Sequence, residues 1–144
     1  MADKGIERRL CQRFKIPGAT ISYRREKLFS TQTSFDNEFC PVLDISRGGV
    51  RFLTQKPLKF KSKVVLQISV PGERIPLVLK GRVRWSSFNP GKSYKYQAGI
   101  QFNAYGEEKG QNYPGILVKI IALEQKFSEP TNGEGSDKSS EFSI

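Results

Sequence analysis

The fold class is decided by one stretch of the chain, which reads Val64-Val65-Leu66-Gln67-Ile68-Ser69-Val70-Pro71-Gly72-Glu73 and continues from Leu77 to Trp85. On both sides of Pro71-Gly72-Glu73, apolar residues recur at every second position. A period of two is typical of a β-strand with one buried face, and a Pro-Gly pair is a strong turn signal. The stretch therefore predicts a β-hairpin.

Four further segments have the composition or the alternation of strands, at residues 19–24, 39–45, 49–54 and 94–102. Only the C-terminal part is helical in pattern. There Pro114 suits a first helical turn, and an apolar stripe follows at Ile116, Ile120, Leu123 and Phe127. Six short strands with hairpin spacing predict a mainly β fold, a small six-stranded antiparallel barrel with a C-terminal α-helix, because closure removes exposed strand edges.

The chain of 144 residues is long enough for one domain with a tail. We expect an arginine-rich N-terminal arm at 1–16, flexible because it lacks a core anchor, and a barrel with its helix at 17–127. Residues 128–144 are rich in Gly and Ser and hold four acidic side chains against one lysine, so we expect a disordered acidic tail. No apolar run is long enough to span a membrane and no secretory signal is visible, which predicts a cytoplasmic protein.

Composition argues against an enzyme. The chain has no histidine and only two cysteines, Cys11 and Cys40, which form no CxxC pair and cannot make a zinc site alone. Exposed acidic pairs such as Glu107-Glu108 have no partner base. The Gly-Lys-Ser at residues 91–93 lacks the rest of a phosphate-binding loop and fits a hairpin connection. We therefore expect no catalytic residue, no metal site and no cofactor.

The net charge of +10 is unevenly distributed, since residues 1–127 hold 23 basic and 10 acidic side chains. A domain this basic favours a polyanionic or phosphate-bearing partner. The alternative is that the positive charge has no specific partner and only keeps the protein soluble.

Two clusters are candidates for binding such a partner. Arg8, Arg9 and Arg13 stand close together near the N-terminus, and a guanidinium group suits both phosphate and the Hoogsteen edge of guanine. By default, however, three such residues in an arm make a generic basic tail. Arg47 and Arg51 repeat the four-residue interval, which we read as accidental.

The second cluster lies between two predicted strands, where Asp44 and Ser46 are two residues apart and Gly48-Gly49 follows. A carboxylate there can accept hydrogen bonds from guanine, a hydroxyl can bind phosphate oxygen, and glycine permits a sharp turn and close approach. Alternatively, this is an ordinary turn in which Asp44 and Ser46 cap local backbone groups.

Together, the two clusters resemble the motifs of the PilZ family, Arg-x-x-x-Arg followed by (Asp/Asn)-x-Ser-x-x-Gly. Arg9 and Arg13 match the first motif, and Asp44, Ser46 and Gly49 match the second. Weaker echoes are the segment that ends at Trp85 and the segment Gly99–Phe102. The resemblance covers about residues 6–127 and implies a small antiparallel barrel with a helix, here in a stand-alone single-domain protein.

The resemblance also implies a bacterial receptor for the second messenger cyclic di-GMP. Arg9 and Arg13 would hold phosphate and guanine, and Asp44 would read a guanine edge. Ser46 would contact the polar backbone of the ligand and Gly49 would leave room for it. Arg8, just outside the motif, would stack on a base and help to hold a second ligand molecule.

The mechanism that we expect is ordering of the arm over the ligand, with the new surface read by an unknown downstream protein. The main alternative is a small-barrel protein that binds single-stranded nucleic acid, with five aromatic residues as stacking surfaces: Tyr23, Phe52, Trp85, Tyr94 and Tyr96. A third possibility is a scaffold that has lost ligand binding. Intact motif residues favour the cyclic di-GMP receptor over both.

Overall fold

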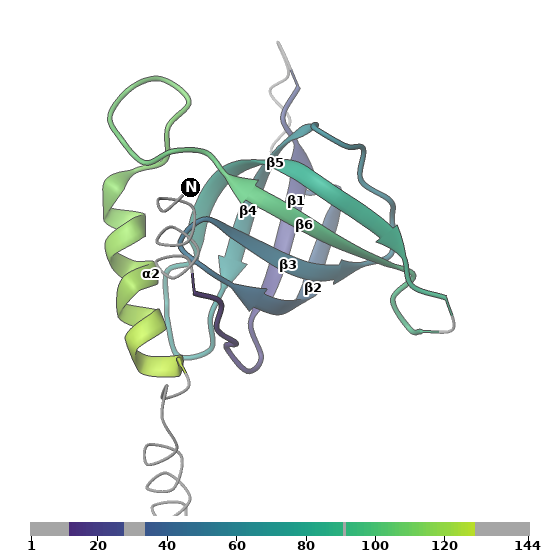
Figure 1. The fold of residues 1–144 in the computed structure, drawn as a ribbon, viewed down its shortest axis with the longest axis horizontal. Helices are drawn as coiled ribbons and strands as arrows, with labels where there is room; N and C mark the ends of the chain where they lie inside the picture. The colour runs from purple at the N-terminus through teal and green to yellow at the C-terminus, as the bar shows by residue number, and fades with distance from the viewer. Residues whose placement is uncertain (1–11, 28–33, 91, 129–144) are drawn as a thin grey trace, which may run out of the picture.

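The computed structural model describes residues 12–27, 34–90 and 92–128, and in these residues the chain forms a closed antiparallel barrel with one helix beside it (Figure 1). The elements in chain order are β1 (Thr20–Arg25), β2 (Asn37–Ile45), β3 (Gly49–Thr54), β4 (Lys63–Ser69), β5 (Leu77–Phe88), β6 (Tyr96–Phe102) and α2 (Pro114–Phe127). Around the barrel the strands run in the order β1-β2-β3-β6-β5-β4, and β4 pairs with β1 to close it. The predicted fold is confirmed.

The β4–β5 hairpin forms as its alternation predicts. Val64 pairs with Gly81 and Leu66 with Leu79, and the side chains of Val64, Leu66 and Leu79 are fully buried inside the barrel. Gly72 in the connecting turn has φ +89°, the left-handed region that glycine enters without a steric penalty. Burial of one face of each strand thus supplies the core and fixes the register.

The sheet differs from the prediction at the end of β5. The sequence pattern ends at Trp85, but the strand continues to Phe88, where Ser86, Ser87 and Phe88 pair with Ala98, Gln97 and Tyr96. Serine is a common turn residue, and here cross-strand pairing outweighs that preference. The Gly-Lys-Ser segment nevertheless lies in the connection between β5 and β6, as predicted.

Helix α2 packs its apolar stripe on the barrel. Pro114 occupies the first turn, Ile120 and Leu123 are buried, and Ile116 and Phe127 are partly buried against the core. Figure 1 shows α2 beside the barrel, on the side where the described segment before β1 begins. Among the described residues, no helix is long and apolar enough to cross a membrane.

The segment just before β1 is anchored in the core, which differs from the unanchored arm that we expected over 1–16. Phe14 and Ile16 are each 4% exposed. The Phe14 amide donates to the Ile45 carbonyl at 2.9 Å, and the Ile45 amide donates back to Phe14. The sequence did not reveal this contact, because two apolar residues among charged neighbours are too few to show the apolar period of a strand or a helix. Residues 1–11, and the expected disordered tail except Ser128, lie outside the described residues.

We predict that Phe14→Ala lowers the free energy of unfolding by about 3–5 kcal/mol, because it leaves a cavity under the end of β2. Lys15→Ala, at the exposed neighbouring position, is the matched control and should change it by less than about 0.5 kcal/mol. Urea titration measures both. Equal stabilities for the two variants would show that the segment is not anchored.

Candidate functional site

The turn between β2 and β3 brings a carboxylate opposite an arginine. Ile45 pairs with Val50 and Asp44 with Arg51, so the last polar side chain of β2 faces the first one of β3. Arg51 Nε donates to both carboxylate oxygens of Asp44, at 3.0 and 3.1 Å, and Arg51 Nη2 also donates to Oδ2. Asp44 is only 4% exposed. The hairpin register therefore builds a charge pair that is buried on its acidic side.

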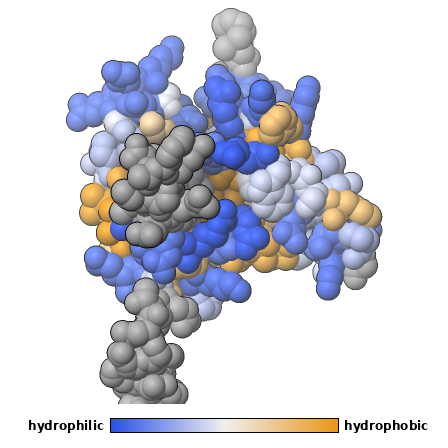
Figure 2. All heavy atoms as spheres, viewed as in Figure 1, coloured by the Kyte–Doolittle hydropathy of each residue, from blue (hydrophilic) through white to orange (hydrophobic). Residues whose placement is uncertain are grey.

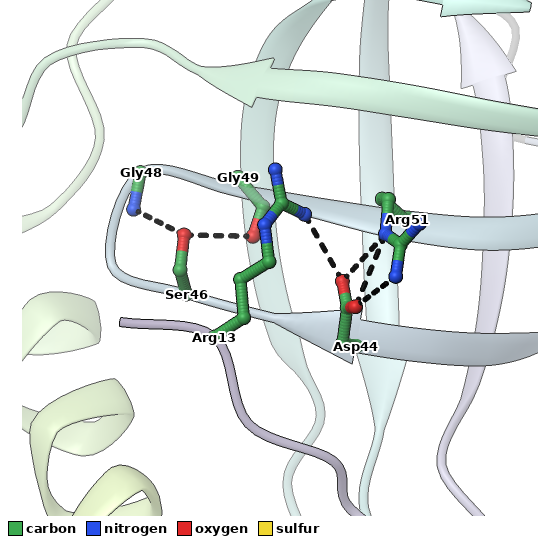
Figure 3. A network of polar contacts seen from close by, with 6 residues as sticks. All are labelled: Arg13, Asp44, Ser46, Gly48, Gly49 and Arg51. Atoms are coloured by element: carbon green, nitrogen blue, oxygen red, sulfur yellow. Dashed lines mark hydrogen bonds and ion pairs between the residues drawn. The ribbon is translucent and has the colours of Figure 1, made fainter. Parts of the chain in front are cut away.

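Arg13 reaches the same carboxylate from a third segment. Its Nη1 donates to Asp44 Oδ1 at 3.1 Å, while its side chain stays 57% exposed (Figure 3). The backbone pairing of Phe14 with Ile45 places Arg13 there, one residue from the end of β2. The structure thus brings together Arg13 and Asp44, as the sequence predicted, and adds Arg51.

Two opposing effects set the pKa of Asp44. Burial raises it, but the hydrogen bonds and positive charges of Arg51 and Arg13 outweigh burial and hold it below the ordinary value of a carboxyl group. In the same pair, the hydrogen bond from Arg51 to Asp44 raises the pKa of the guanidinium. The carboxylate is therefore ionised at neutral pH and orients both guanidinium groups.

Ser46 acts locally in this structure. Its Oγ accepts from the Gly48 amide at 3.2 Å and lies 3.5 Å from the Gly49 carbonyl, to which it donates. This is the local cap that we weighed as the alternative. Asp44 does not cap the turn, because its oxygens point to Arg13 and Arg51.

Gly49 is needed for packing within the sheet. A Cβ there would overlap the carbonyl oxygen of Ile100 on β6, so a side chain would push β3 and β6 apart. Neither Gly48 nor Gly49 has a positive φ, so this turn does not use the left-handed backbone that glycine permits. Gly49 also lines a cavity.

That cavity has a volume of about 640 Å³. Its wall includes Arg13, Ser46, Gly49, Arg51, Arg84 and Trp85. Trp85 is 36% exposed and lies against Gly99, where any side chain would overlap its indole ring. Arg84 Nη1 donates to Gln101 Oε1 at 2.7 Å, which holds its guanidinium near the cavity. The volume lies within the range of small-molecule sites.

Sequence reasoning missed Arg51 and Arg84. We dismissed Arg51 together with Arg47 as an accidental repeat, and the two differ in the structure. Arg47 points away to Glu124 on α2, at 2.9 Å. The pairing of Arg51 with Asp44 could have been found by counting outward from the four-residue turn, which places these two residues opposite each other.

Two of the five aromatic residues that the nucleic-acid alternative needs for stacking are buried. Tyr23 and Phe52 are 2% and 0% exposed and pack against each other inside the barrel, with ring centroids 5.6 Å apart. Tyr96 packs edge-on against Phe88, and of the five only Trp85 lines the cavity. The aromatic residues therefore do not form a continuous stacking surface.

Two of the predicted ligand-binding residues, Arg8 and Arg9, lie outside the described residues, as does Cys11. Within the described part of the chain, no three His, Cys, Asp or Glu side chains gather where they could hold a metal ion. Cys40 is buried with a free thiol, and burial raises its pKa.

Comparison with known proteins points to one family. A profile of the PilZ domain matches residues 7–112. Among solved structures, the chain is similar to the Bacillus subtilis inhibitor of motility (MotI/DgrA), with a TM-score of 0.54 and 18% identity. The similarity covers 81% of this chain but only 48% of that protein, so the chain spans about half the length of that relative. No match to a curated protein was found.

We predict that Asp44→Asn lowers the free energy of unfolding at pH 7 by about 1–3 kcal/mol, since a buried acceptor for two cations loses its charge. A carboxyl whose pKa is lowered by folding stabilises the protein above its unfolded pKa of about 4 and loses this effect as the pH falls through the folded pKa. The difference between wild type and variant should therefore shrink below about pH 4. Chemical denaturation at a series of pH values measures it, and a difference that grows on acidification contradicts the pairing.

Proposed function

This chain belongs to the PilZ domain family, whose members are non-catalytic receptors for cyclic di-GMP, and on that premise we propose that it binds cyclic di-GMP in the cavity beside the β2–β3 turn. The cavity supports this proposal because three guanidinium groups and one exposed indole line a single hollow: Arg13, Arg51, Arg84 and Trp85. The ligand is a dianion with two guanine bases. Guanidinium groups suit its phosphates and guanine edges, and the indole offers a face for stacking.

Asp44 would serve mainly by positioning. Its two oxygens are engaged by Arg51 and Arg13. For it to read a guanine edge directly, one of these arginines has to release an oxygen and turn to the ligand. Arg13 is the better candidate, because it makes a single contact and is more exposed than Arg51.

Ser46 and Gly49 would shape the wall of the site. Both line the cavity, and the hydroxyl of Ser46 holds the turn that carries them. A phosphate oxygen could replace the Gly49 carbonyl as the acceptor for this hydroxyl, since that contact is long at 3.5 Å.

Arg8 and Arg9 would close over the bound ligand from the N-terminal side. The anchored pair Phe14 and Ile16 fixes the base of this segment, so only the residues before it need to be ordered on binding. Charge-assisted hydrogen bonds to phosphate would offset the entropy lost. A downstream protein would then read the altered surface in the bacterial cytoplasm, where the messenger occurs.

We predict that Arg13→Ala and Arg51→Ala each weaken cyclic di-GMP binding about tenfold to a hundredfold, the equivalent of one lost bidentate contact of about 1–3 kcal/mol. Arg74→Ala, at an exposed position in the β4–β5 turn, removes the same charge away from the site and is the matched control. Calorimetric titration gives the affinities. The single tryptophan of the chain lines the cavity, so ligand binding should also change its fluorescence.

Two outcomes would contradict this proposal. One is an equal affinity of the wild type and all three variants for cyclic di-GMP, and the other is binding that leaves the tryptophan fluorescence unchanged. A linear single-stranded RNA tested in the same way separates the alternative. If it competes with cyclic di-GMP at similar concentration and its binding weakens steeply with salt, the chain is a general nucleic-acid binder.

Ordering of the N-terminal segment makes its own prediction. Amide hydrogen exchange in residues 5–12 should slow when cyclic di-GMP is added, while the Phe14 amide, which donates to the Ile45 carbonyl, should already be protected without ligand. Mass spectrometry of peptides from this region measures both. Unchanged exchange at 5–12 in a saturated complex would leave the receptor assignment intact but remove the proposed ordering.

A further inference from the structure

We propose that the acidic C-terminal segment, residues 129–144, occupies the arginine-lined cavity of this chain and competes there with cyclic di-GMP. The inference rests on the proposed function only for the identity of the competing ligand. It concerns the part of the chain whose charge is opposite to that of the barrel and to which the site gives no role.

The cavity is short of negative charge. Arg13, Arg51 and Arg84 contribute three positive charges to its wall, and no acidic residue is among the described residues that line it. Asp44 lies behind this wall, 4% exposed, and balances part of the charge of Arg13 and Arg51. Arg84 contacts only the neutral amide of Gln101 among the hydrogen bonds of the described chain. Exposed guanidinium groups around one hollow attract any carboxylate that can reach them.

The chain leaves the barrel at the edge of this cavity. Gln12 lines the cavity, and its Nε2 donates to Ser128 Oγ at 3.0 Å. One turn earlier, Glu124 pairs with Arg47 in the β2–β3 turn. These two contacts hold the last turn of α2 beside the site, and Figure 3 shows turns of this helix next to Ser46 and Gly48. The space-filling view shows strongly hydrophilic side chains gathered over this face (Figure 2).

The segment that follows Ser128 has the complementary charge. It holds four acidic residues and one lysine: Glu129, Glu134, Asp137, Glu141 and Lys138. Glu134, Asp137 and Glu141 follow Ser128 by 6, 9 and 13 residues, which span up to about 20, 30 and 40 Å when extended, so their carboxylates can reach the cavity from its edge. A second cavity lies between α2 and the β4–β5 turn and is lined by two basic residues and Glu73, so its charge fits the segment less well.

The expected strength follows from tethering. A short tether gives an effective concentration in the millimolar range, so even weak ion pairs occupy the cavity for a large fraction of the time. A ligand that needs the empty cavity then binds with an affinity reduced by the fraction that is empty. If the untethered segment has a dissociation constant of about 0.1–0.5 mM, the affinity for the competing ligand falls several-fold.

The test uses the full chain with two matched sets of four substitutions. One set neutralises the segment: Glu129→Gln, Glu134→Gln, Asp137→Asn and Glu141→Gln. The control set neutralises four exposed acidic residues elsewhere: Glu38→Gln, Glu73→Gln, Glu107→Gln and Glu108→Gln. Both sets change the net charge equally. Calorimetric titration with cyclic di-GMP is done at low and at high salt, and quenching of Trp85 by the uncharged quencher acrylamide is measured without ligand.

We expect the segment variant to bind cyclic di-GMP about three- to tenfold more tightly than wild type at low salt, with the difference shrinking at high salt. The control variant should change affinity less than about twofold, because none of its four residues lines the cavity and salt screens exposed charges that are not in direct contact. In the segment variant Trp85 should also be quenched more readily, since the cavity is emptied.

Two results would overturn the inference. In one, the segment and control variants gain the same affinity, which would make the effect one of overall charge. In the other, both affinity and quenching are unchanged in the segment variant. If no variant binds cyclic di-GMP, the proposed function fails, and the quenching measurement alone still decides whether the segment occupies the cavity.

Discussion

Asp44 is a buried carboxylate at the end of a strand, and a buried carboxylate is costly unless cations and hydrogen bonds surround it. Here the cations come from two directions, Arg51 across the hairpin and Arg13 from the segment before β1. The same pairing holds the guanidinium groups at the wall of the cavity. One ion triad therefore stabilises the turn, attaches the N-terminal segment and arranges the groups that an anion would meet.

The barrel supports this arrangement through close backbone approaches. At Gly49 and at Gly81 a Cβ would overlap the carbonyl oxygens of Ile100 and Gln101 on β6. Gly99 likewise has no side chain to overlap the indole of Trp85, so the ring packs directly on the backbone of β6. Because β3, β5 and β6 meet this closely, the cavity between the turn and Trp85 lies on tightly packed strands, and a site that is formed in advance loses less entropy on binding.

The sequence was sufficient for the barrel because alternation reports burial directly, as in Val64, Leu66 and Leu79, and because the apolar stripe of α2 follows a helical period. It was insufficient where tertiary contact overrides local preference. Ser86 and Ser87 continue a strand, and Phe14 and Ile16 are anchored although their neighbours are charged. In the site, the motif residues Arg13 and Asp44 were found, while Arg51 was missed because only the register of the hairpin reveals it.

The anchoring of Phe14 and Ile16 lowers the entropy cost of the proposed ligand binding. If the whole segment had to be ordered, each residue fixed would cost about 1–2 kcal/mol of backbone entropy. Arg13 is instead held in place by the backbone pairing of its neighbour Phe14 with Ile45 and by its own ion pair with the carboxylate of Asp44. The backbone that carries Arg13 is therefore fixed, and the proposed binding would need only its side chain to turn. Arg47 and Gln12 tie the same turn and segment to Glu124 and Ser128 on the other side, so a ligand that displaces Arg13 acts on a unit that already includes the end of α2.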